Sequence, residues 1–416
     1  MKSKISHQLK LAKDASHALA YLSSSQKNTA LYEMIRSLKK GKSEILKANQ
    51  LDILKTQKMG KNESFFLRLK LTDAKINEMI KGIEQIINIE DPIGKIDNGW
   101  TRPNGLQISK IRVPLGVIAV VFESRPNVVS DVCALALKSG NAIILKGGIE
   151  ATHTNAVITH FLKKGLENSK ISQEIIQFLE IPKHEDIKIL LKLSEYIDVV
   201  IPRGGKALIK MVVENSKIPV IFQNQGICHA FIDETADLEM AMRIVINAKT
   251  SNPSVCNAIE CLLVHQTIAE QFLRKIGPQL LMNRVEIRGD RETLKWIPEA
   301  KAVCPEDYGY EFLDLILAVR VVQSIEEALD HISKFGSQHS EVIVTNSLEN
   351  ERKFLSEVDA ACVYSNASTR FTDGGEFGFG AEIGISTQKL HARGPVGLQE
   401  LTTYKYIIRG SGQIRE

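Results

Sequence analysis

The 416-residue chain lacks several features that would place it in a special class of protein. It has no apolar run of the length that a membrane span requires. Aromatic residues make up only 6% of the sequence, and basic residues (53) barely outnumber acidic ones (49), which gives a net charge of +4. We therefore expect no membrane partner and no nucleic-acid partner, since nucleic-acid binding needs a basic face with exposed aromatics. The composition predicts an ordinary globular protein of two or three domains.

Cysteine is also scarce, and its spacing excludes two kinds of structure. No C-x-x-C pair occurs, so we predict neither a disulfide scaffold nor a metal site. Free thiols fit a reducing compartment and predict a cytoplasmic protein. The basic N-terminal segment contains Asp14 and no arginine within residues 1–22, so we interpret it as an ordinary helix rather than a targeting peptide. The cysteines are Cys133, Cys228, Cys256, Cys261, Cys304 and Cys362.

Hydrophobic periodicity divides the chain into a helical part and an α/β part. Residues 1–90 carry Leu and Ile at helical spacing, without strand-like alternation. After residue 115, β-branched runs alternate with helical segments, as in "PLGVIAVVFE", "NVVSDVCALALKSG" and "NAIILKGG". A second series of this kind begins near residue 227 with "ICHAFID". The alternation predicts βαβ units with parallel strands, and therefore an α/β fold.

The stretch "KTSNPSVCNAIECLLVH" (residues 249–265) places Cys256 in a short polar break between a helical pattern and an apolar run. A thiol nucleophile needs access, a lowered pKa and a donor for the oxyanion that it creates. Pro253 ends the preceding helix, which leaves Cys256 in a turn where its N–H is able to serve an oxyanion. Spacing alone favours a loop thiol without a role, because most cysteines in large intracellular chains take no part in chemistry. Cys261 alternates with Ile259 and Leu263, so we interpret it as a core residue.

The sequence contains no G-x-G-x-x-G, the usual fingerprint of a dinucleotide site. A glycine-rich turn with positive charge does occur at a strand-to-helix junction, and helix N-termini attract phosphate. We predict a phosphate contact at this turn, against the alternative of a plain connection. Its residues are Arg203, Gly204, Gly205 and Lys206.

Several longer segments resemble one known family. They include "VPLGVIAVVFESRPNVVSDVCALALKSGNAIILKGGIEA", "PSVCNAIE", "EFLDLILAV" and "NASTRFTDGGEFGFGAEIGISTQKLHARGPVGLQELTTYKYI". In this order they are similar to the gamma-glutamyl phosphate reductases, a branch of the aldehyde dehydrogenase superfamily. The resemblance implies an aldehyde-dehydrogenase-like α/β fold with a Rossmann-like cofactor domain, an α/β catalytic domain and a small β oligomerisation element.

The resemblance also implies where these parts lie. Residues 1–225 would form the NADP-binding domain, with residues 100–113 contributing to the oligomerisation element. Residues 226–365 would form the catalytic domain that carries Cys256. Residues 366–416 would contain an anchor loop, return to the cofactor domain and end in the oligomerisation strand. A C-terminal strand that closes a partner's sheet predicts a homo-oligomer.

The implied activity is the NADPH-dependent reduction of L-glutamyl 5-phosphate to L-glutamate 5-semialdehyde, the second step of proline biosynthesis. The Cys256 thiolate would attack the carbonyl and expel phosphate, and hydride from NADPH would reduce the resulting thioester. Glutamate 5-kinase is a further expected partner, through transient channelling of the acyl phosphate.

Two oxyanions form on this path, so a donor must lie beside the thiol. The Cys256 N–H and the Asn257 side chain are candidates. The position of the donor in ordinary aldehyde dehydrogenases falls on Arg125, with Asn127 close behind. A cation there suits a phosphorylated substrate, and a surface arginine is the alternative interpretation.

Further site residues follow from the resemblance. Lys146 corresponds to the superfamily lysine that contacts the adenosine ribose, and Glu311 to the glutamate that holds the nicotinamide ribose. Ile149 stands where NAD-preferring members often carry a glutamate, which favours NADP, although Glu150 follows it.

The segment "NASTRF" matches the loop that anchors the substrate tail in related enzymes. It makes Ser368, Thr369 and Arg370 candidates for substrate binding, because an arginine is able to pair with a carboxylate through two hydrogen bonds. A tight structural turn is the alternative interpretation.

Two other functions remain open from sequence alone. A hydrolytic dehydrogenase needs a water-activating acid, whose position falls near Gln223, and a glutamine cannot act as that base. A silent scaffold for the kinase is disfavoured by the intact Cys256, Lys146 and Glu311. His229 has the chemistry of a general base, but on an apolar strand a hydrogen-bonded structural histidine is an equally good interpretation.

Overall fold

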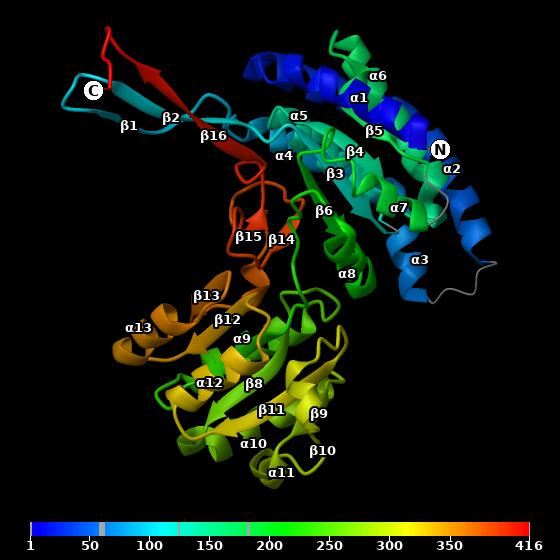
Figure 1. The fold of residues 1–416 in the computed structure, drawn as a ribbon. Helices are drawn as coiled ribbons and strands as arrows, with labels where there is room; N and C mark the ends of the chain where they lie inside the picture. The colour runs from blue at the N-terminus through cyan, green and yellow to red at the C-terminus, as the bar shows by residue number, and fades with distance from the viewer. Residues whose placement is uncertain (1, 58–62, 124, 181–183, 416) are drawn as a thin grey trace. The chain divides into compact units, whose positions relative to one another are not determined.

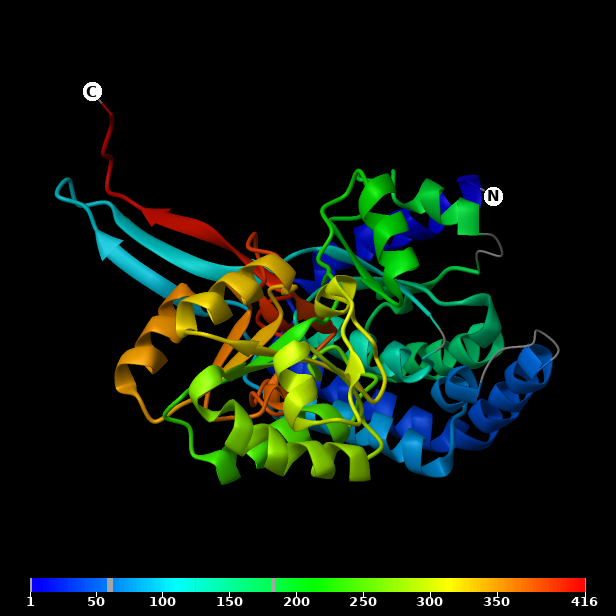
Figure 2. The ribbon, with the colours of Figure 1, turned by 90° about the horizontal axis from the view of Figure 1, so that it is seen from below.

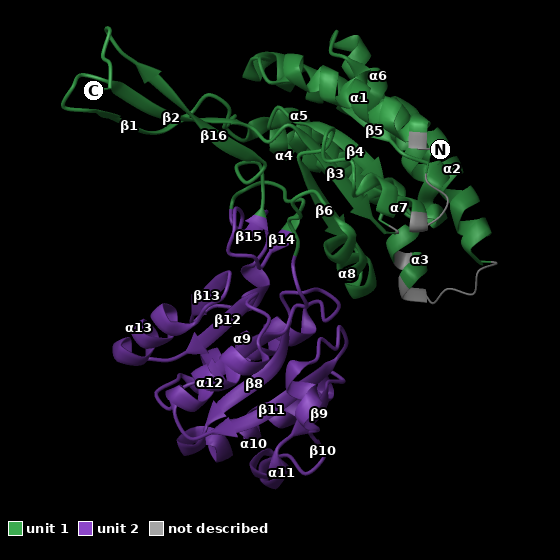
Figure 3. Cartoon of the chain, viewed as in Figure 1, with its two compact units in different colours: residues 1–222, 378–384, 396–416 green, residues 223–377, 385–395 purple. Residues whose placement is uncertain are grey.

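The chain forms two compact units, each built around its own parallel sheet (Figure 3). This arrangement confirms the predicted α/β fold. Unit 1 comprises residues 1–222, 378–384 and 396–416, and unit 2 comprises residues 223–377 and 385–395. The computed structural model describes residues 2–57, 63–123, 125–180 and 184–415. No helix in these ranges is both long and apolar enough to cross a membrane.

The N-terminal part of unit 1 is helical, as the periodicity of residues 1–90 predicts. Apolar residues that recur every three or four positions give each helix one stripe to bury. In α4 this stripe includes Ile76, Ile80, Ile83 and Ile87, which are all buried. The Thr72 hydroxyl accepts a hydrogen bond from the Lys75 N–H (3.2 Å) and caps the first turn of α4. These helices are α1 (Lys2–Leu19), α2 (Ser24–Gln57), α3 (Glu63–Leu69) and α4 (Asp73–Asn88).

The sheet of unit 1 has four parallel strands in the order β5-β4-β3-β6. Every residue of β3 and β4 is buried, as expected for central strands that are covered on both faces. The chain moves from β3 to β4 and β5, then returns to the other side of β3 for β6, so the strand order reverses there. The strands are β3 (Val117–Phe122), β4 (Ala142–Lys146), β5 (Ile176–Phe178) and β6 (Val199–Arg203), and the helices are α5 (Asn127–Lys138), α6 (Thr152–Asn168), α7 (His184–Leu190) and α8 (Lys206–Asn215).

A three-stranded antiparallel sheet extends from the rest of unit 1 as an arm (Figures 1 and 2). Its central strand, β2, pairs with β1 on one side and with the C-terminal β16 on the other. The sequence segment near residue 100 and the last strand therefore do join in one sheet within the chain. The strands are β1 (Ile96–Thr101), β2 (Gln107–Pro114) and β16 (Thr402–Arg409).

The sheet of unit 2 has seven parallel strands in the order β10-β9-β11-β8-β7-β12-β13. The strands are β7 (Cys228–Ile232), β8 (Ile259–His265), β9 (Glu286–Gly289), β10 (Lys301–Ala302), β11 (Ile316–Val322), β12 (Ser340–Val344) and β13 (Cys362–Ser365). The helices are α9 (Leu238–Thr250), α10 (Gln266–Met282), α11 (Arg291–Trp296), α12 (Ile325–Phe335) and α13 (Leu348–Glu357). Two short strands, β14 (Gly384–Ser386) and β15 (Gly394–Val396), pair with each other.

The seven-stranded sheet has two buried faces, because successive side chains of a strand point to opposite sides. One face carries Ala230, Leu262 and Val342 and packs with α9 and α10. The other carries Phe231 and Leu263 and packs with α12 and α13. By the same alternation His229, Cys261 and Glu341 belong to the second face, which gives a polar row inside a largely apolar layer.

Glycine lets helices α2 and α6 pack closely in unit 1. A Cβ at Gly165 would lie 2.6 Å from backbone atoms of Met34. Gly165→Ala is therefore expected to lower the free energy of unfolding by about 1–3 kcal/mol, although alanine is the better helix former. Urea denaturation measures this change. The control is Gly82→Ala in α4, where the nearest neighbour of the new Cβ is 3.6 Å away, and a neutral or stabilising effect is expected. Equal destabilisation by both variants would contradict the packing argument.

Candidate active site

In unit 1, predicted cofactor residues meet at the carboxyl ends of the parallel strands. Val121 of β3 pairs with Lys146, the last residue of β4, and Phe122 pairs with Arg203, the last residue of β6. Lys146 and Arg203 therefore lie at one edge of the sheet, on either side of β3, where the strand order reverses. In open α/β sheets, ligands bind outside the carboxyl ends of the strands at such a reversal.

Two buried polar side chains, Lys146 and Asn155, lie at the end of β4. Lys146 is almost fully buried, and its Nζ donates to the Gly147 carbonyl (2.6 Å). Burial lowers the pKa of Lys146, and the Glu150 carboxylate partly opposes this shift. The Asn155 carboxamide lies against Gly147, is fully buried and makes no hydrogen bond to any described residue. Since an unpaired buried carboxamide is costly, these groups fit the hydroxyls and phosphates of a dinucleotide.

The turn at residues 203–206 differs from a simple phosphate cradle. The Gly205 N–H, at the start of α8, donates to the Glu123 carboxylate (2.9 Å). A carboxylate thus already lies at this helix N-terminus, where it interacts favourably with the helix dipole. A phosphate at this turn would depend on the side chains of Arg203 and Lys206 to offset the charge of Glu123.

The other predicted residues of unit 1 lie where β3 leads into α5. Arg125 and Asn127 are both exposed there. The Asn127 carboxamide donates to Asp131 (3.3 Å), one turn further along α5. Burial raises the pKa of Asp131 to about 6, against the opposing effect of the hydrogen bonds from Asn127 and Ser130. Asn127 is therefore tied to its own helix.

In unit 2, Cys256 lies in the turn that connects α9 to β8, as predicted, and it is half-buried. Gly226 packs directly against it, because a Cβ on Gly226 would lie 2.2–2.6 Å from atoms of Cys256. The Cys228 thiol, fully buried on β7, donates to the Cys256 carbonyl (3.2 Å). The backbone of Cys256, the predicted nucleophile, is thus held in place by contacts with Gly226 and Cys228 at the start of β7.

A buried ion pair joins the two elements that flank the Cys256 turn, the end of α9 and the start of β8. Lys249, at the end of α9, and Glu260, at the start of β8, are fully buried, with Nζ and Oε2 2.6 Å apart. Lys249 also donates to the Ile259 carbonyl (3.0 Å), and Glu260 accepts from the Leu313 N–H (3.1 Å). Burial raises the pKa of Glu260 to about 7, although Lys249 opposes this shift. Loss of either partner would leave a buried uncompensated charge.

Asn257 joins the Cys256 turn to the predicted anchor loop. Its Nδ2 donates to the carbonyls of Thr372 (2.9 Å) and Arg370 (3.4 Å), and its Oδ1 accepts from Arg370 Nη1. The Thr369 hydroxyl donates to the Asn257 carbonyl (2.6 Å), and Arg370 Nε donates to Ser251 (3.0 Å). In this conformation the Asn257 carboxamide is engaged by the loop rather than directed at an oxyanion.

Within the anchor loop, the three predicted substrate residues differ in exposure. Ser368 and Thr369 are buried, and the Ser368 hydroxyl accepts from the Arg370 N–H (3.3 Å). Arg370 is only half-buried. Of the three, Arg370 is therefore the side chain best placed to reach a substrate, while Ser368 and Thr369 shape the loop.

Glu311 also approaches the Cys256 turn. Its carboxylate accepts a hydrogen bond from the Gly226 N–H (2.8 Å), and Gly226 is the residue that packs on Cys256. The amino ends of β7, β8 and β11 thus gather Gly226, Cys256 and Glu311 at one edge of the sheet.

His229 has the surroundings of a structural residue. It is fully buried, and the Glu341 carboxylate accepts from both its backbone N–H (2.7 Å) and its Nδ1 (3.0 Å). Burial alone would lower the pKa of His229, but the Glu341 carboxylate and the Cys261 thiol together oppose this effect and raise the pKa to about 10. The structure thus supports the structural interpretation of His229 over that of a general base.

Sequence reasoning missed four contacts around these sites: Gly226 against Cys256, the Lys249–Glu260 pair, Thr372 as a partner of Asn257, and Glu123 at the glycine-rich turn. Only one had a signal in the sequence. Lys249 and Glu260 bracket the cysteine segment, and charges inside apolar patterns are seldom buried unless they are paired.

Comparisons with known proteins agree with this architecture. The model of the aldehyde dehydrogenase family matches residues 1–293. The gamma-glutamyl phosphate reductase of Clostridium kluyveri is 52% identical over 407 residues, 98% of this chain and 97% of the relative. The enzyme of the same name from Francisella philomiragia is 53% identical over 406 residues, 98% of each chain. The crystal structure of gamma-glutamyl phosphate reductase from Thermotoga maritima has a TM-score of 0.97, 45% identity and 99% coverage of both chains.

The chain therefore belongs to the aldehyde dehydrogenase family, in the branch of the gamma-glutamyl phosphate reductases. As a member of that family it is an oxidoreductase with a nicotinamide cofactor.

Proposed function

We propose that this chain reduces L-glutamyl 5-phosphate to L-glutamate 5-semialdehyde and phosphate with NADPH, in the second step of proline biosynthesis, through a thioester on Cys256. The names of relatives that match the whole chain support the reaction. The observation that carries the mechanism is the half-buried Cys256 in a turn that Asn257 connects to Arg370.

The chemistry requires Cys256 to act twice. Its thiolate attacks the acyl carbon, a C–S bond forms, and the bond to phosphate breaks with its electron pair leaving on phosphate. After reduction, the C–S bond breaks, the aldehyde leaves and the thiolate is restored. Gly226, Cys228 and the Lys249–Glu260 pair hold the turn in one geometry, which favours a repeated attack from the same position.

The cofactor would be held mainly by residues at the carboxyl edge of the unit 1 sheet. Lys146 and the buried Asn155 carboxamide offer groups for ribose hydroxyls, and Arg203 and Lys206 offer positive charge for phosphates. When bound, NADPH would supply the hydride. Ile149 in place of a carboxylate favours the 2′-phosphate of NADP over NAD.

Substrate recognition is proposed to depend on Arg370. The substrate keeps a free α-carboxylate, and a half-buried guanidinium binds a carboxylate more strongly than a fully exposed one does. Asn257 accepts from Nη1 and Ser251 accepts from Nε, so the guanidinium is held in one orientation.

The reaction and its nucleophile are tested together in the reverse direction. With glutamate 5-semialdehyde and NADP⁺, reduction of NADP⁺ should require inorganic phosphate, and Cys256→Ser should lower kcat by at least about 10³-fold. Cys304→Ser, which alters the exposed cysteine, is the control and should retain full activity. Activity without phosphate would indicate a hydrolytic dehydrogenase, and full activity in Cys256→Ser would exclude this thiol.

Asn257→Ala separates a positioning role from an oxyanion role. If Asn257 orients Arg370, the variant should raise KM for glutamate 5-semialdehyde by about 10–100-fold with a smaller change in kcat. An oxyanion donor would instead lower kcat by about 10²–10³-fold. Asn252→Ala is the matched control, because among the described residues the Asn252 side chain accepts hydrogen bonds only from Ser254 in the same turn.

The arm is proposed to form a homo-oligomer. One of its faces carries Trp100, Tyr404, Tyr406 and Ile408, all exposed, and a contiguous exposed apolar patch marks an interaction site. Tyr406→Glu should reduce the molar mass measured by light scattering to that of a single chain. Lys405→Glu, on the opposite face of β16, should leave the mass unchanged. An unchanged mass in both variants would place the interface elsewhere. Transient channelling with glutamate 5-kinase and the cytoplasmic location stay predictions.

A further inference from the structure

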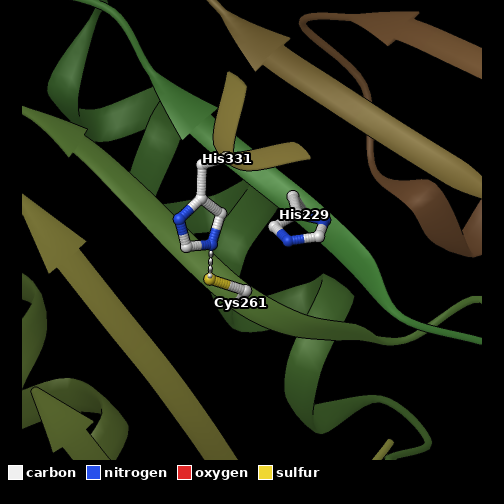
Figure 4. A group of neighbouring side chains, drawn as sticks. All are labelled: His229, Cys261 and His331. Carbon is white, nitrogen blue, oxygen red and sulfur yellow. Dashed lines mark hydrogen bonds between the residues drawn. The ribbon is translucent and has the colours of Figure 1, made fainter. Parts of the chain in front are cut away.

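A second cluster of reactive side chains lies inside unit 2. Three neighbouring strands place Cys261 of β8, His229 of β7 and Glu341 of β12 in one row, because the strand register pairs each with the next. All three residues belong to the sheet face that packs with α12, and His331 of that helix lies beside His229 and Cys261 (Figure 4). One ligand atom each of His229, Cys261 and His331 lies within 4.8 Å of the others, and all three residues are buried.

The cluster contains an unpaired polar atom. His229 Nδ1 is bound to the Glu341 carboxylate (3.0 Å), while His229 Nε2 is buried and makes no hydrogen bond to any described residue. His331 Nε2 lies 3.6 Å from the Cys261 sulfur. An imidazole that is oriented by a carboxylate and presents its other nitrogen to a thiol is the arrangement in which proteins hold metal ligands.

We propose that His229, Cys261 and His331 form a binding site for a thiophilic divalent ion of the Zn²⁺ class. One sulfur and two imidazole nitrogens are a donor set that Zn²⁺ prefers over the all-oxygen set of Mg²⁺ or Ca²⁺. Binding releases the thiol proton of Cys261 and also the Nε2 proton of His229, whose raised pKa keeps the imidazole protonated in the absence of the ion. The ligands that remain are a thiolate and a neutral imidazole. The negative charge of Glu341 favours a cation at His229 Nε2.

The hydrogen bond between Arg320 and His331 opposes binding of the ion to His331. Its Nη1 donates to His331 Nδ1 (2.8 Å), and because arginine is always a donor, the hydrogen of neutral His331 must lie on Nε2. Coordination through Nε2 requires that this hydrogen move to Nδ1, which displaces Arg320 Nη1. Arg320 retains its second partner, since Nη2 donates to Glu327 (2.5 Å). Arg320 therefore weakens the site without blocking it.

One member of the cluster, His331, borders a cavity. His331 lines a cavity of about 410 Å³ together with Tyr308, Arg320, Glu327 and Lys334. Three protein ligands require a fourth ligand to complete a tetrahedral Zn²⁺ site, and we propose that a water from this cavity supplies it. The site joins β7, β8 and α12, so the ion should also stabilise unit 2.

Cobalt is the sharper probe, because a thiolate bound to Co²⁺ produces a charge-transfer absorption band. The full chain in a Cys304→Ser background should bind one equivalent of Co²⁺ with this band, and Zn²⁺ should displace it and raise the unfolding temperature. Cys261→Ala should lose the band and the thermal shift. Cys256→Ser should keep both, which separates this site from the proposed nucleophile and from the proposed reaction.

Two further variants change the residues that bind the Nδ1 atoms of the two histidines, Glu341 at His229 and Arg320 at His331. Glu341→Gln should weaken Co²⁺ binding by about 10–100-fold, the usual effect of removing a partner of a metal-bound histidine. Arg320→Gln should tighten it, because a glutamine oxygen is able to accept from His331 Nδ1. Absence of the band in a folded Cys304→Ser protein, or its survival in Cys261→Ala, would overturn the proposal. His331→Gln provides the same test should Cys261→Ala fail to fold.

Discussion

Burial of parallel strands on both faces is the constraint on which the rest of this structure depends. Every backbone group of β3, β4, β7 and β8 lies in the interior, so its hydrogen bonds must be made within the sheet. The faces are then occupied by side-chain packing, and the two ends of the strands are the places left for chemistry. In unit 1 the proposed cofactor residues Lys146 and Arg203 lie at the carboxyl ends of the strands, on either side of β3. In unit 2 the proposed nucleophile Cys256 lies with Gly226 and Glu311 at the amino ends.

Because the sheet of unit 2 is buried on both faces, a polar residue in its interior indicates a structural or functional role. A buried polar or charged group persists only when it is paired. Among such groups in unit 2 are the Lys249–Glu260 pair, the His229–Glu341 pair, and the Asn257 carboxamide with the 370–372 loop. Two of them brace the Cys256 turn. The His229–Glu341 pair lies on the other face of the sheet, and for that reason we assign it a separate role in ion binding.

Positioning in this protein depends on backbone contacts as much as on side chains. Gly226 allows the chain before β7 to lie against Cys256, and its N–H binds Glu311. Glu123 binds the Gly205 N–H at the start of α8, where the sequence alone favours a phosphate. These contacts explain why a residue's type and spacing are insufficient to assign its role. Asn257 is the clearest case, because its carboxamide is a good oxyanion donor by composition but is engaged by Arg370 and Thr372 in the structure.

The sequence by itself determined the α/β class, the alternation of strands with helices in two series, the turn that carries Cys256 and, through its long C-terminal motif, the family. These features are local, since periodicity and turn residues act over a few neighbouring positions. Only the tertiary structure decided which residues meet across the sheets: Asn257 with Arg370, Lys249 with Glu260, and Cys261 with His229 and His331. The cysteines show no metal-binding spacing in the sequence because the ligands come from two strands and a helix. Strand register, which no local pattern specifies, brings them within 4.8 Å of one another.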